Sequence, residues 1–120
     1  MIFSIDFKKL LKSFKFAFSG LKIILEEEHA FKIMFLVAIL VIIAMFYFNL
    51  PLTQKAVLFA MIILVLILEL VNSVIEKVLD FVCSGLNGKV KIIKDVLAGI
   101  VLLASLGAAT LGLLIFLPYF

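Results

Sequence analysis

The chain has 120 residues, of which 67% are hydrophobic and 16% are charged, with a mean hydropathy of +1.40 and a formal net charge of +3. A soluble domain contains about 45–50% apolar and about 25% charged residues, so this composition excludes a water-soluble globular fold and predicts a protein embedded in lipid. The positive charge comes from lysine alone, and no basic face with interleaved aromatic residues is visible on a soluble fold, which argues against a nucleic-acid partner.

The first predicted element, residues 1–28, is a basic amphipathic helix. Its apolar side chains recur every three or four residues and share one helical face: Phe3, Phe7, Leu10, Phe14, Phe18, Leu21 and Leu25. The opposite face carries Lys8, Lys12, Lys15 and Lys22. A secretory signal peptide gathers its charges ahead of an apolar core, which this segment does not do. We expect the helix to lie in the membrane interface.

Three apolar segments that can cross a bilayer follow, at about 30–48, 55–81 and 94–117. Residues 49–53 predict a tight turn between the first two, and residues 84–91 predict a loop before the third. The third segment is rich in small residues, which allow membrane helices to approach closely. We therefore expect one all-α membrane domain over residues 1–120, with an interfacial helix and three transmembrane helices.

The distribution of lysine predicts the orientation in the membrane. Ten of the eleven lysines fall on one predicted side, and only Lys55 falls on the other. The positive-inside rule therefore places the N-terminus and the loop of residues 82–95 in the cytoplasm.

The second apolar segment carries a row of polar residues that we call the polar stripe. On a helix these residues fall within an arc of about 100°: Glu69, Asn72, Ser73, Glu76 and Asp80. Ionisable groups at membrane depth cost about 2.5–3.5 kcal/mol each, and they face a bundle interior or a water-filled cavity. The alternative is a seam of interhelical hydrogen bonds, for which one amide would be enough. We interpret the stripe as a functional site.

The depth of each residue in the membrane predicts its chemistry. A helix that enters the bilayer near Lys55 reaches Glu69 after about 21 Å, within the inner third of a core about 30 Å thick. Glu69 would then lie at the depth of a lipid hydroxyl and would suit a general base. Glu76 and Asp80 would lie at the interface, where a water-soluble nucleotide approaches.

The carboxylates also predict a cation. Glu76 and Asp80 could share it with the acidic run Glu26-Glu27-Glu28, and oxygen ligands favour Mg²⁺ over zinc. Cys83 is the only cysteine, so neither an intrachain disulfide nor a cysteine-based metal site can form.

Two further groups with ionisable side chains lie near the stripe in the sequence. His29 is interpreted as a residue at headgroup level rather than a metal ligand. Lys94 and Asp95 open the third segment, where the lysine can neutralise phosphate charge and the carboxylate can orient it. Without the neighbouring stripe, this pair would indicate only the start of a helix.

These residues resemble the prokaryotic diacylglycerol kinase and undecaprenol kinase family. The pattern is Glu69-x-x-Asn72-Ser73-x-Ile75-Glu76-x-x-x-Asp80, followed by Lys94-Asp95 before a helix of small residues. The similarity extends to Lys12-Ser13-Phe14, Ala17, Gly20 and Glu28-His-Ala-Phe31-Lys32. The segment Gly112–Pro118 is similar to the undecaprenol kinase branch. Family members often have a histidine where Asn87 stands, so no nucleotide contact is transferred from residues 84–90.

The resemblance implies a small homotrimer in the bacterial cytoplasmic membrane, with active sites shared between subunits. It implies transfer of the ATP γ-phosphate to a lipid alcohol, with Glu69 contacting the lipid hydroxyl as the base. Glu28 and Glu76 would hold Mg²⁺. The residues expected to bind the nucleotide are Glu28, Asn72, Glu76, Asp80, Lys94 and Asp95.

Alternatives remain for the substrate and for the class of protein. Undecaprenol and diacylglycerol both present a primary hydroxyl, and the C-terminal resemblance favours undecaprenol. A small proton-coupled multidrug transporter is expected to have four spans and a single acidic residue in the first, unlike the pattern here. A holin or assembly protein needs no row of carboxylates.

Overall fold

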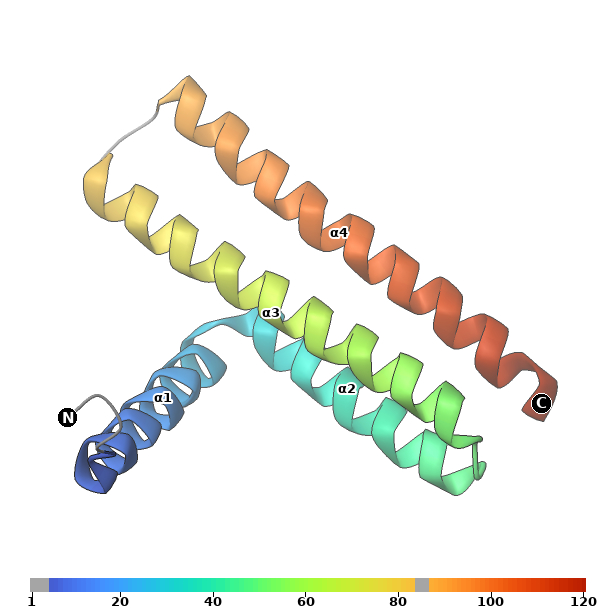
Figure 1. Cartoon of the computed structure of the whole chain (residues 1–120). Helices are drawn as coiled ribbons and strands as arrows, with labels where there is room; N and C mark the ends of the chain where they lie inside the picture. The colour runs from blue at the N-terminus through green and yellow to red at the C-terminus, as the bar shows by residue number, and fades with distance from the viewer. Residues whose placement is uncertain (1–4, 84–86) are drawn as a thin grey trace.

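The computed structural model describes residues 5–83 and 87–120. Within these ranges the chain is all-α, which confirms the predicted fold class (Figure 1). The elements are α1 (Phe7–Glu27), α2 (His29–Tyr47), α3 (Leu52–Val82), α4 (Gly88–Phe116) and the short 3₁₀ helix η1 (Leu117–Tyr119).

Three of these helical segments are long and apolar enough to cross a membrane: α2, α3, and α4 continued by η1. Many of their large apolar side chains are exposed in the single chain, as is typical of helices that contact lipid. The prediction of three spanning helices is therefore confirmed by length and composition.

Helix α3 is the central element, because both α2 and α4 run alongside it (Figure 1). With 19 residues α2 is about 28 Å long, whereas the 31 residues of α3 extend for about 46 Å. The last third of α3 therefore continues beyond the beginning of α2. The polar stripe from Asn72 onward lies on this extension, and Glu69 lies just before it.

The turn between α2 and α3 is shorter than predicted. It ends at Pro51, and residues 52–53, which the sequence placed in the turn, are helical. Pro51 has a φ of −56°, which suits the start of a helix, and it has no N–H group to leave unpaired. Asn49 adopts a left-handed conformation with a φ of 51°, which asparagine tolerates. The turn packs on a small buried core of Met45, Leu50 and Leu58.

The predicted loop before the third span is also too long. Helix α4 begins at Gly88, so residues 88–91 are helical rather than part of a loop. The side-chain oxygen of Asn87 accepts a hydrogen bond of 2.9 Å from the Lys89 N–H and caps the helix. Residues 84–86 of the predicted loop lie outside the described residues, as does Phe3 of the predicted amphipathic face.

Helix α1 diverges from the three long helices (Figure 1). Asp6 caps it by accepting hydrogen bonds from the N–H groups of Lys8 and Lys9, and none of its residues is buried. It meets α2 at Glu28, whose φ of −97° and ψ of 108° interrupt the helical path. The apolar face of α1 is thus free to contact lipid, as the amphipathic pattern predicts.

Candidate functional site

The polar stripe is buried at one end and exposed at the other. Glu69, Asn72 and Ser73 retain only 5%, 8% and 1% of their accessible surface. Glu76, about one turn further along α3, is half-buried, and Asp80 is exposed. The stripe therefore leads from the interior of the helix bundle to the end of α3.

Two side-chain oxygen atoms of the buried part lack hydrogen-bond partners within the described chain. The Asn72 Oδ1 and Ser73 Oγ atoms are both inaccessible, and neither is paired within the described chain. A buried polar group without a partner costs about 1–3 kcal/mol. Unpaired polar atoms beside a buried carboxylate are more typical of a binding site than of a packed core.

The junction between α1 and α2 brings a further carboxylate to the stripe. Glu28, at this junction, and Glu76, on α3, both lie within electrostatic range of the Glu69 carboxylate. Glu26, which the sequence grouped with them, instead lies 4.0 Å from Lys22 on the exposed side of α1. The acidic run is thus divided between two faces of the chain.

The start of α4 brings a positively charged side chain, Lys94, to the exposed end of the stripe. The Lys94 Nζ donates a hydrogen bond of 2.5 Å to Asp80 Oδ1, which joins α4 to the exposed end of α3. Asp95 does not take part in this contact, because it forms a 2.6 Å ion pair with Lys91 one turn away in α4. The structure therefore brings Lys94 to the stripe and leaves Asp95 at its margin.

A divalent cation fits this set of residues only in part. Among the described residues, no three histidine, cysteine, aspartate or glutamate side chains gather closely enough to hold a metal. Mg²⁺, however, is usually held by one or two carboxylates together with substrate phosphates and water. Glu28 and Glu76 thus suit a cation that arrives with phosphate groups rather than a preformed metal cage.

Sequence reasoning did not assign Lys77 to the site. Its Nζ lies 3.2 Å from Glu28 Oε1 and 3.5 Å from Glu27 Oε2, and so it links α3 to the junction between α1 and α2. The sequence did contain a signal for this role, because Lys77 is the single lysine among the carboxylates of residues 69–80. It lies next to Glu76, about 100° further around the helix.

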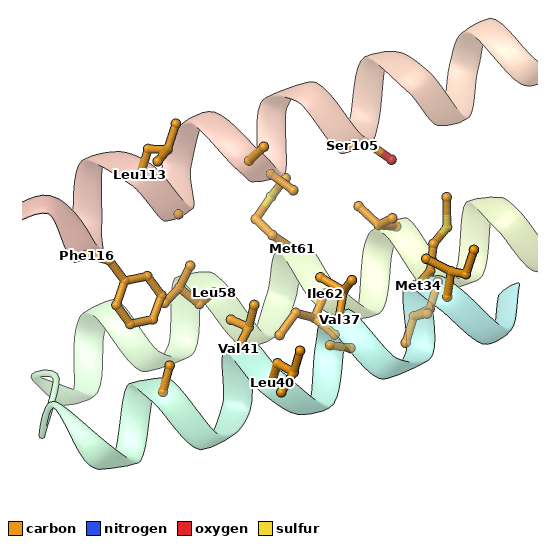
Figure 2. Close-up of a pocket in the computed structure, with 18 of the residues that line it drawn as sticks. Met34, Val37, Leu40, Val41, Leu58, Met61, Ile62, Ser105, Leu113 and Phe116 are labelled. Carbon is orange, nitrogen blue, oxygen red and sulfur yellow. The ribbon is translucent and has the colours of Figure 1, made fainter. Parts of the chain in front are cut away.

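An apolar groove of about 790 Å³ runs between α2, α3 and α4 (Figure 2). Its α4 wall includes the small residues Ala108 and Gly112, and Ser105 contributes a hydroxyl that is buried without a partner. The part of its lining that belongs to α3 consists of Leu58, Met61, Ile62, Val65 and Leu66.

The groove and the polar stripe lie on one face of α3. The spacing of three and four residues that runs through the groove lining to Leu66 continues directly to Glu69 and then to Ser73. A single helical face is thus apolar over its first half and rich in carboxylates over its second half.

These features define a small α-helical membrane protein in which one face of α3 first lines an apolar groove and then carries a carboxylate-rich stripe. The family model for prokaryotic diacylglycerol kinase matches residues 15–116, and the chain therefore belongs to that family. It is 36% identical, over 110 residues, to a diacylglycerol kinase of Synechocystis sp.. The match covers 91% of this chain but only 63% of that relative, so the chain spans less than two thirds of the relative's length.

Proposed function

We propose that the protein is a lipid kinase that transfers the γ-phosphate of ATP to the hydroxyl group of a membrane lipid alcohol. The observation that supports this most directly is the continuous face of α3, on which the apolar groove leads to Glu69. A lipid whose tail follows the groove would present its hydroxyl at this carboxylate. Membership of the diacylglycerol kinase family supports the same reaction.

Glu69 would act as the general base. It is buried on α3, one turn beyond Leu66 of the groove lining, and from there its carboxylate would accept the proton of the lipid hydroxyl as the oxygen attacks the γ-phosphate. Catalysis of phosphoryl transfer consists mainly of positioning and charge neutralisation, and burial serves both because it excludes water.

The nucleotide would occupy the exposed half of the polar stripe. Glu28 and Glu76 would hold Mg²⁺, which supplies positive charge to the phosphates when bound. Lys94, held beside the stripe by Asp80, would neutralise further phosphate charge. Asn72 has an unpaired side-chain oxygen for a hydrogen-bond donor, and Asp95 would contact the nucleotide from α4.

We favour undecaprenol as the acceptor, on the similarity of Gly112–Pro118 to the undecaprenol kinase branch. Diacylglycerol is the second candidate, because the relative from Synechocystis sp. is named a diacylglycerol kinase. Transfer of radiolabelled phosphate from ATP by the purified protein, measured with each lipid in the same micelles, tests both. A higher kcat/KM for diacylglycerol would overturn our choice of acceptor, and no transfer to either lipid would overturn the proposed function.

We also propose a single lipid kinase domain that assembles as a homotrimer with shared sites, in the bacterial cytoplasmic membrane with a cytoplasmic N-terminus. Glu76 is only half-buried in the single chain, so its side chain is accessible to a neighbouring subunit at the stripe. The mass of the protein in detergent tests the assembly, and labelling of a cysteine placed in α1 from either side of the membrane tests the orientation.

Glu28→Gln and Glu76→Gln should each raise the Mg²⁺ concentration needed for half-maximal turnover. An amide keeps the shape of the side chain but loses its charge, and a contact with a charged group is worth about 1.5–3 kcal/mol, which corresponds to about ten- to hundredfold. Titration of Mg²⁺ at a fixed ATP concentration measures the change. An unchanged requirement in both variants would remove these residues as ligands.

The paired exchange Asp80→Lys with Lys94→Asp separates a structural role from nucleotide binding. The ion pair is retained with its direction reversed, so thermal stability should change by no more than the roughly 0–1 kcal/mol typical of exposed pairs. The positive charge moves from α4 to α3, however, and no longer lies where it would neutralise phosphate, so we expect the KM for ATP to rise. Normal ATP kinetics in the exchanged protein would show that the pair only joins the two helices.

A further inference from the structure

Lys77 joins parts of the chain that are far apart in sequence. Two other ion pairs, Lys22–Glu26 and Lys91–Asp95, connect residues one turn apart within a single helix. The contacts of Lys77 instead connect α3 to the end of α1 and to the residue between α1 and α2. They are therefore tertiary contacts, and their loss would change how the helices are placed.

Close packing does little to hold α1 in position. None of its side chains is buried, and the single residue Glu28 connects it to α2 through a non-helical conformation. Between α1 and α3 lies a cavity of about 670 Å³, lined by apolar residues of both helices and also by Glu27 and Lys77. Within the described chain, the polar side-chain contacts between α3 and the junction of α1 with α2 are the two ion pairs of Lys77.

The Glu28 carboxylate has no local partner that could fix its direction. Its backbone N–H donates to the Ile24 carbonyl at 2.8 Å, and its carbonyl accepts from the Lys32 N–H at 3.1 Å. Its side chain makes no capping hydrogen bond to α2. The 3.2 Å contact with Lys77 is thus what orients the carboxylate, which is the less exposed of the two that Lys77 meets.

We propose that Lys77 is a positioning residue that ties the junction between α1 and α2 to α3 and so places the Glu28 carboxylate beside Glu69 and Glu76. Its effect on catalysis rests on the proposed function, whereas its effect on helix placement does not. The ammonium also offsets repulsion among the gathered carboxylates. Glu27, whose carboxylate lies 3.5 Å from the Lys77 Nζ, would keep Lys77 attached to the junction when the Glu28 carboxylate binds a metal ion.

Helix placement can be measured directly on the full chain in bilayer discs. Spin labels are attached to cysteines introduced at Ser13 in α1 and Val78 in α3, with Cys83 replaced by serine and the labelled protein diluted with unlabelled protein. We expect Lys77→Gln to broaden or shift the distribution of distances between the labels, and Lys77→Arg to restore it. Lys22→Gln, which removes an ion pair within α1, is the matched control and should leave the distribution unchanged. A Lys77→Gln distribution identical to that of the wild type would overturn the proposal.

Cation binding gives a second readout, which a merely structural role would not change. With a non-hydrolysable ATP analogue present, electron paramagnetic resonance should show Mn²⁺ binding weakened on the order of tenfold in Lys77→Gln and restored in Lys77→Arg. In turnover, the KM for the metal–ATP complex should rise while the KM for the lipid stays constant. Unchanged or tighter Mn²⁺ binding would overturn the positioning role. If the wild type showed no lipid kinase activity, the proposed function would fail, but the spin-label comparison would still decide whether Lys77 places α1.

Discussion

Replacement of Glu69 with glutamine is expected to reduce phosphoryl transfer by about 10²–10⁴-fold, the range that general acid–base catalysis contributes. Glutamine has nearly the same shape as glutamate but cannot accept the proton of the lipid hydroxyl. Because the site is buried, no water molecule has ready access to replace the carboxylate as base. The measurement is the rate at which radiolabel passes from ATP to the lipid, in protein shown to be inserted and assembled like the wild type.

The matched control for this prediction is Glu26→Gln. Glu26 belongs to the exposed pair with Lys22 on α1, so its replacement removes one carboxylate without changing the polar stripe. We expect this control to retain near-normal turnover. Activity within a few-fold of the wild type in Glu69→Gln would exclude Glu69 as the base.

A phenylalanine in place of Ala108 should reduce kcat/KM for the lipid by about 10²-fold, while the KM for ATP stays close to that of the wild type. Ala108 lines the apolar groove, and an aromatic ring at this position would occupy space that the lipid tail needs. The tail would gain little from leaving the equally apolar bilayer, so the proposed role of the groove is to direct the hydroxyl to Glu69. A misplacement of about 1 Å at a reacting group can cost about 10²-fold.

Leu103→Phe provides the control for the groove prediction. Leu103 belongs to the same helix, but its side chain is 74% exposed and does not line the groove. An aromatic ring there should leave lipid kinetics unchanged. Equal effects of the two substitutions would indicate a general disturbance of α4 rather than a tail-binding groove, and normal kinetics in Ala108→Phe would place the tail elsewhere.

The sequence predicts those parts of the site that depend on one helix at a time. The residues of the polar stripe share a face because the helical period alone places them there. The three spans follow equally from the lengths of the apolar segments.

Contacts between distant segments could not be derived in this way. The ion pair of Lys77 with Glu28 depends on the angle at which α1 leaves α2, and the periodicity of neither helix contains that angle. The groove depends on how α4 lies against α3, which is a property of packing. The errors at residues 52–53 and 88–91 were local, because these residues were interpreted as turn and loop although the helices begin directly after Pro51 and Asn87.

Helix α3 is about 46 Å long, whereas the hydrocarbon core of a typical bilayer measures about 30 Å. A single rigid rod therefore carries Glu69, and the thickness of the surrounding lipid sets the height of this carboxylate relative to the headgroups. Thicker or thinner membranes would shift the carboxylate relative to the two proposed substrates, one confined to the lipid and the other to water, or would tilt the helix to compensate. If the proposed function holds, the acyl-chain length of the host bilayer becomes a variable of the rate of phosphoryl transfer, and an optimum at one thickness is the expected signature.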